Sequence, residues 1–151
     1  MPTRRDTLQH SLAVAGLLAA AGLLPREALA FNKAAFDART IADAARAFGG
    51  GVPAESRDVT LTAPEIAENG AVVPMAIAAT LPDVRQLLLL VERNPNALVA
   101  MFEVGEAVAP DFAINAKMSQ TSDVYAVAIT RDGKAFYARR EVRVTLGGCG
   151  A

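Results

Sequence analysis

Residues 124–146 read VYAVAITRDGKAFYARREVRVTL, and this stretch decides the fold. Apolar and polar side chains alternate on both sides of Asp132-Gly133, and in the second half Val142, Val144 and Leu146 share one face. A period of two is typical of a β-strand with one buried face, and Asp-Gly is a tight-turn signal. The stretch therefore predicts a β-hairpin.

Upstream of the hairpin, further strand-like segments are separated by turn signals. Asn69-Gly70 leads into one of them, and Arg93-Asn94-Pro95-Asn96 separates two nearly continuous apolar runs, of which Leu87 to Val91 is also compatible with a short helix. Pro74 places its strand at an edge or a bulge. The segments are 58–62, 73–79, 86–92, 98–104 and 112–118. With the hairpin they give about seven strands, the pattern of an antiparallel immunoglobulin-like β-sandwich.

The segment before the strands has a helical period. From Lys33 to Phe48, apolar residues recur at Ile41, Ala44, Ala45 and Phe48, and the pattern stops at three glycines, 49–51. This spacing predicts one amphipathic helix that covers a sheet edge or packs on a partner.

The first thirty residues resemble an export signal. The pair Arg4-Arg5 precedes an apolar run from Leu12 to Leu24, and Ala28-Leu29-Ala30 is a small-residue cleavage pattern. The run is too short to span a bilayer comfortably, and the arginine pair indicates the twin-arginine route, although Thr7 stands where that motif usually has Phe. We expect cleavage after Ala30, with residues 31–151 forming one domain of ordinary size.

The chain has one cysteine, Cys149, which follows Gly147 and Gly148 and precedes Gly150. Glycine restrains the backbone little, so the sequence predicts an exposed thiol on a flexible arm of residues 147–151. The alternative is an idle residue in a frayed terminus. An unpaired cysteine in an exported protein indicates either a reactive thiol or an intermolecular disulfide. Lipoprotein and prenylation motifs need the cysteine elsewhere.

Other residue types limit the chemistry. The only histidine, His10, lies in the signal, which excludes Ser-His-Asp and Cys-His catalysis and histidine metal sites in the exported chain. The formal net charge is −1, and the densest basic group, Arg139-Arg140 with Arg143, lies in a predicted strand. A solvated strand face is the favoured interpretation of these arginines, and a site that attracts an anion carried on the nearby thiol is the alternative. No feature recommends nucleic acid.

Three features together resemble the SoxY family, the sulfur-carrier subunits of the periplasmic thiosulfate-oxidising Sox system. They are the arginine-pair signal, the internal segment from Pro64 to Pro74 (PEIAENGAVVP) and the ending from Val144 to Gly150 (VTLGGCG). The family usually ends in Gly-Gly-Cys-Gly-Gly, so Ala151 departs from the pattern at the last residue.

The resemblance implies a carrier rather than an enzyme. In the family, sulfur intermediates are bound covalently to the cysteine, which here is Cys149, and no cofactor is expected. The implied partners are a SoxZ-like subunit, a haem-containing SoxAX-like enzyme, a SoxB-like hydrolase and a SoxCD-like dehydrogenase. The implied location is the periplasm, with no membrane attachment after cleavage.

Two other classes of function remain open at this stage. An enzyme with Cys149 as a peroxidatic or disulfide-exchange thiol is disfavoured, because no resolving cysteine or nearby cationic side chain accompanies it. The second is an exported partner-binding sandwich domain in which Cys149 links two copies by a disulfide.

Overall fold

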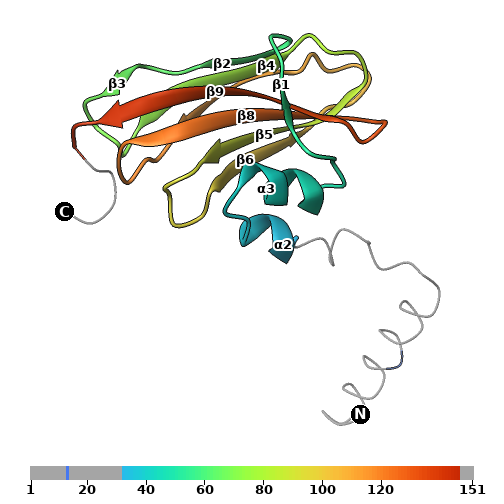
Figure 1. The fold of residues 1–151 in the computed structure, drawn as a ribbon, viewed down its shortest axis with the longest axis horizontal. Helices are drawn as coiled ribbons and strands as arrows, with labels where there is room; N and C mark the ends of the chain where they lie inside the picture. Colours follow the sequence, from blue (N-terminus) through green and yellow to red (C-terminus); the bar gives the residue numbers. More distant parts are fainter. Residues whose placement is uncertain (1–12, 14–31, 147–151) are drawn as a thin grey trace, which may run out of the picture. The chain divides into compact units, whose positions relative to one another are not determined.

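The computed structural model describes residue 13 and residues 32–146, and the described β-strands form two sheets (Figure 1). The helices and strands, in chain order, are α2 Lys33–Phe36, α3 Ile41–Ala47, β1 Ala54–Glu55, β2 Val59–Thr62, β3 Ile66–Ala67, β4 Val73–Ala79, β5 Val84–Val91, β6 Leu98–Glu103, β7 Asp111–Ala116, β8 Ser122–Thr130 and β9 Ala135–Val144. The export-signal residues Arg4, Arg5, Ala28 and Ala30 and the arm residues Gly147, Gly148, Cys149 and Gly150 lie outside the described residues.

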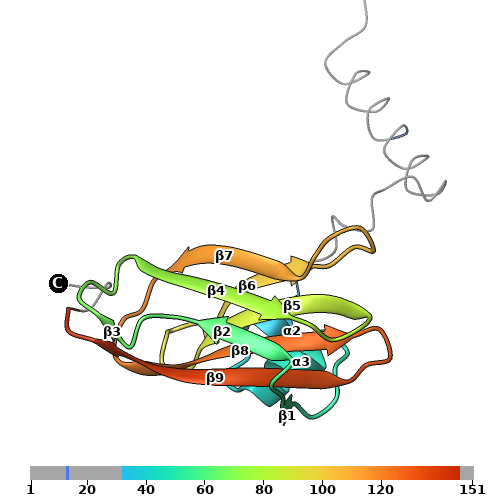
Figure 2. The same ribbon diagram turned by 90° about the horizontal axis from the view of Figure 1, so that it is seen from above.

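The two sheets pack face to face as a β-sandwich. The larger sheet has the order β1-β9-β8-β5-β6, with β3 also pairing with β9, and the smaller sheet has the order β2-β4-β7 (Figure 2). The predicted immunoglobulin-like sandwich with seven main strands is confirmed, as is the hairpin of β8 and β9. The segment from Leu87 to Val91 is part of a strand. The two-residue strands β1 and β3 pair with β9 in parallel, which the sequence did not predict.

The apolar run of β5 is continuous because both of its faces are covered. Leu87 and Leu89 lie in the core between the sheets, together with Ile77 of β4, and are fully buried. Leu88 and Leu90 point the opposite way into a second cluster that includes Ala44 and Ala45 of α3. A strand buried on both faces loses the alternating pattern, which explains the ambiguity between strand and helix in this segment.

The predicted single helix from Lys33 to Phe48 is instead two helices. Thr40 has an extended backbone and its side chain accepts a hydrogen bond from the Asp43 amide at 3.1 Å, the geometry of an N-cap. A new helix, α3, therefore begins after Thr40. Ala44 and Ala45 are fully buried against the outer face of the larger sheet, so α3 covers a sheet face rather than an edge (Figure 1).

Pro74 lies in β4, the central strand of the smaller sheet. It pairs with Asn115 of β7, whereas β2 pairs with β4 only from Ala76 to Ala79. One side of Pro74 is therefore free of a neighbouring strand, so the prediction of a local edge holds although β4 is central.

The hairpin turn between β8 and β9 contains a carboxylate with a lowered pKa. The Thr130 hydroxyl donates a hydrogen bond to Asp132, and Lys134 contributes its backbone amide at 3.3 Å and its ammonium group at 3.1 Å. Gly133 follows with φ of +84°, a conformation that favours glycine. The hydrogen bonds from Thr130 and Lys134 lower the pKa of Asp132 to about 2.

We expect Asp132 to stabilise the fold only above its ordinary pKa. Its folded pKa is lower than the ordinary value of 3.8, so the stabilisation is complete above pH 4 and is lost as the pH falls through about 2. Replacing Thr130 with valine should raise the pKa toward 3.8, measured by NMR titration of the carboxyl carbon. The matched control is Thr62→Val, on the exposed face of β2. An unchanged pKa in Thr130→Val would show that this hydroxyl is not the main cause.

Among the described residues, no helix is long and apolar enough to cross a membrane.

Candidate functional site

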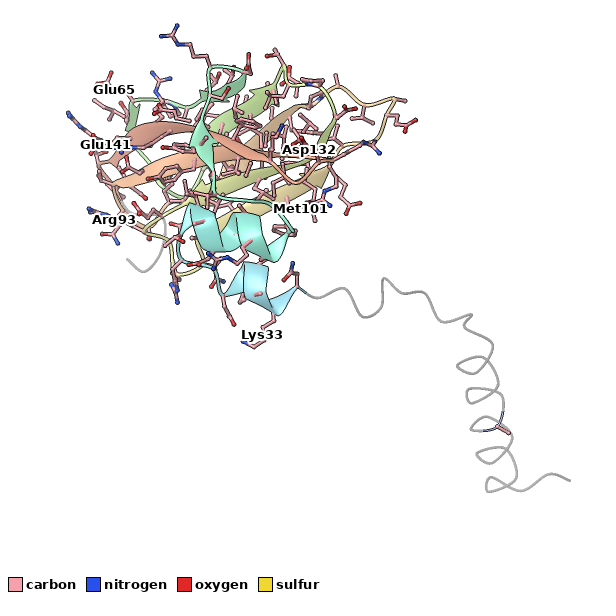
Figure 3. The ribbon with its side chains drawn as sticks, turned by 45° about the vertical axis from the view of Figure 1, so that its right-hand side comes forward. Lys33, Glu65, Arg93, Met101, Asp132 and Glu141 are labelled. Atoms are coloured by element: carbon pink, nitrogen blue, oxygen red, sulfur yellow. The ribbon has the colours of Figure 1, made fainter. Side chains whose placement is uncertain are left out.

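The candidate site is the end of the sandwich where β9 runs out. Beyond Val144 the chain continues through Thr145 to Leu146, the last described residue before the segment 147–151. Strand β3 lies beside this end of β9 (Figure 1). Figure 3 shows Glu65 and Glu141 at the same end of the molecule, away from Asp132 in the opposite hairpin. We call Thr145, Leu146 and their hydrogen-bond partners the arm root.

The arm root is held by the internal segment 65–70. The Arg143 amide donates to the Glu65 carbonyl at 3.0 Å, and the Thr145 amide donates to the Ala67 carbonyl at 3.1 Å. The Gly70 amide then donates to the Leu146 carbonyl at 2.7 Å. Hydrogen bonds therefore join segment 65–70 to the chain from Arg143 up to the last described residue.

Side chains add to this anchoring. The Thr145 hydroxyl lies 3.2 Å from the Glu68 carbonyl, and the Val144 amide donates to the Thr121 hydroxyl oxygen at 2.9 Å. The Gly70 carbonyl accepts from the Met118 amide at 2.7 Å, which ties segment 65–70 to the chain that follows β7. Leu146 is thus the fixed end from which residues 147–151 continue.

The structure brings together the two sequence segments that carry the family resemblance. Segment 64–74 and the residues from Val144 onward are far apart in the chain, yet they are hydrogen-bonded at the arm root. The sequence predicted a turn at Asn69-Gly70, and the Asn69 side chain accepts from the Ala71 amide at 2.8 Å, as in such turns. It did not predict that the turn would contact the end of β9.

Three exposed apolar side chains belong to the same region. Ile66 is 54% exposed, Val72 58% and Leu146 64%. Ile66 is paired with Arg143 in the β3–β9 ladder, and Val72 lies two residues beyond Gly70, whose amide binds the Leu146 carbonyl. All three therefore lie on segments held directly to the arm root.

The arginines of β9 do not form one cluster. Arg139 makes an ion pair with Asp123 at 3.1 Å, and this carboxylate raises the pKa of Arg139. Arg140 and Arg143 are exposed, and alternation along the strand directs Arg140 away from the face that carries the other two. Burial raises the pKa of the neighbouring Tyr125, with Glu92 and Asp123 adding to the effect. This arrangement is that of a solvated strand face.

Two hollows lie at the opposite end of the strands. Both are lined by Leu81, Asp83 and Arg131, and their volumes are about 360 and 570 Å³. Their charged side chains form exposed ion pairs, Arg131 with Glu106 and Lys134 with Asp132. Within residues 32–146, no group of three histidine, cysteine, aspartate or glutamate side chains is placed to hold a metal ion. These hollows therefore offer no evident catalytic constellation.

Comparison with known proteins gives one family match. The profile of the family described as "Sulfur oxidation protein SoxY" matches residues 44–149, more than half of the chain. Among solved structures, the sulfur carrier protein SoxY from Chlorobium limicola f thiosulfatophilum is 35% identical, with a TM-score of 0.61, over 69% of this chain and 94% of that one. No curated protein matches the chain.

A second group of similar structures shows the fold alone. The superoxide reductase (neelaredoxin) from Ignicoccus hospitalis is 17% identical, with a TM-score of 0.52, over 58% of this chain and 80% of that one. At this identity the likeness concerns the sandwich and not the chemistry.

Proposed function

Since the chain belongs to the SoxY family and has a sulfur-carrier role in sulfur oxidation, we propose that it binds sulfur intermediates covalently on the thiol of Cys149 and presents them to separate enzymes. In this proposal residues 1–30 are a twin-arginine export signal, residues 31–146 are the sandwich domain and residues 147–151 are the carrier arm. The carrier works in the periplasm.

The observation that carries the proposal is the anchored arm root. The family match extends as far as Cys149, and hydrogen bonding fixes the carbonyl of Leu146, three residues before it. A thiol three residues beyond a fixed point reaches roughly 10 Å from the sandwich, at about 3.3 to 3.6 Å per residue. Gly147 and Gly148 carry no side chains, so this stretch suits a narrow channel in a partner.

The chemistry requires a thiol and external enzymes. Loading joins thiosulfate to the thiol: the S–H bond breaks, an S–S bond forms, one proton is released and two electrons pass to a haem-containing SoxAX-like enzyme. The adduct is Cys–S–S–SO₃⁻. A SoxB-like hydrolase then adds water across the S–S(O₃) bond, releasing sulfate and leaving Cys–S–S⁻. A SoxCD-like dehydrogenase oxidises the remaining sulfane sulfur.

The protein itself supplies the handle and not the catalysis. An ordinary thiol has a pKa of about 8.5 and is only a few per cent ionised at pH 7, so we propose that the partner enzyme activates it. A SoxZ-like subunit is the proposed permanent partner, and export of the folded pair would account for the twin-arginine signal.

The test is the intact mass of the exported protein purified from its host during thiosulfate oxidation, measured before and after reduction, with the modified peptide mapped. A sulfane or thiosulfonate increment on Cys149 that reductant removes is the expected result. A clean thiol, or only a disulfide-linked dimer, would contradict the proposal. The dimer would favour the alternative, an exported partner-binding domain whose Cys149 links two chains.

A further inference from the structure

The three exposed apolar side chains of the arm root differ from ordinary surface residues in where they lie. Isolated exposed hydrophobic residues are normal on any protein. Ile66, Val72 and Leu146 are not isolated, because hydrogen bonds of segment 65–70 and β9 hold their backbones around one point, the Leu146 carbonyl. Each side chain is more than half exposed. We call these three residues the arm collar.

The length of the arm determines what covers the collar. Cys149 is three residues beyond Leu146, so the thiol lies within roughly 10 Å of that residue. An enzyme that acts on the thiol has to enclose it and must therefore approach the sandwich to within a few ångströms of Leu146. The collar is the surface that such an enzyme meets.

We propose that the arm collar is the docking surface for the enzymes that act on Cys149, and that these enzymes present apolar side chains around the entrance to their active-site channel. This inference rests on the proposed carrier function and adds a recognition surface to it. The burial of Ile66, Val72 and Leu146 against that entrance stabilises the complex while the arm is inserted.

The residues around the collar fit a transient interface. Glu65, Glu68 and Arg143 are exposed and carry charges of both signs. An apolar centre with a polar rim is typical of protein interfaces, and a small apolar area suits a complex that must dissociate. A carrier serves several enzymes in succession, so release after each step is as necessary as binding.

The test separates docking from the chemistry of the arm. Tetrathionate loads the carrier without any enzyme, because the Cys149 thiolate attacks one of its central sulfur atoms, forming Cys–S–S–SO₃⁻ and releasing thiosulfate. The loaded protein is then the substrate of the SoxB-like hydrolase from the same host. Sulfate release at increasing carrier concentration gives kcat and KM.

The variant is the triple substitution Ile66→Thr, Val72→Thr and Leu146→Ser, in which Thr keeps the β-branched shape. We expect KM to rise about tenfold or more, since each lost apolar contact weakens binding several-fold, and kcat to stay within about twofold. The matched control is Val52→Thr with Val108→Thr, two exposed valines outside the arm root that should leave KM unchanged.

The outcomes distinguish this inference from the carrier function. If the wild-type protein is hydrolysed and the triple variant has the same KM, the collar is not a docking surface. If the loaded wild-type protein yields no sulfate, the carrier function itself fails. Tetrathionate should load all variants at the same rate. If the triple variant does not fold, Val72→Thr and Leu146→Ser, which lie outside the strands, each should raise KM about threefold, and an unchanged KM in both overturns the inference.

Discussion

Replacing Cys149 with serine is expected to abolish sulfur loading completely. The chain has no other cysteine, so no second thiol can take over. A serine hydroxyl is not ionised near neutral pH and cannot form the S–S bond on which the carrier cycle depends. In a host that relies on this carrier, thiosulfate oxidation should fall to background, and the intact mass of the variant should not change with thiosulfate.

The fold should be unaffected by this substitution, because the described core lies entirely within residues 32–146. The matched control is Ala151→Gly, which gives the ending usual in the family and should load fully. Retained sulfur oxidation in Cys149→Ser would refute the carrier function. Loss of a disulfide-linked dimer with sulfur oxidation intact would support the tether instead.

Truncating Leu89 to alanine is expected to have the largest effect on stability. Leu89 is fully buried between the sheets, in β5, where its neighbours across the ladder are Ala100 and Ala126. These small neighbours have no side chain long enough to fill the space that the substitution leaves. Loss of a buried leucine side chain with little relaxation costs about 3 to 4 kcal/mol, a large part of the stability of a typical domain.

The measurement is urea denaturation monitored by circular dichroism. The matched control is Leu146→Ala, which removes the same atoms from a side chain that is 64% exposed and should change the free energy of unfolding by less than about 0.5 kcal/mol. Equal losses in the two variants would show that Leu89 does not have the burial described.

Local patterns in the sequence were sufficient for most of the sandwich. Alternation gave the main strands, and Asp132-Gly133 gave the hairpin, because a strand with one buried face and a tight turn both depend on near neighbours. The pattern was less informative for Leu87 to Val91, since that strand is buried on both faces. The helix break at Thr40 carried a local signal, an N-cap residue before an apolar period, but the helical spacing from Lys33 onward masked it.

The sequence by itself determined the one feature on which the chemistry depends, a single cysteine among glycines after the last strand, because residue type alone decides which side chain can form an S–S bond. Only the tertiary structure decided what surrounds the base of that arm. Thr145 and Ala67 are 78 residues apart, and β3 has two residues, too few to show a period. Their contact exists because the sandwich brings the end of β9 beside segment 65–70, and the same packing leaves Ile66, Val72 and Leu146 exposed around the arm root.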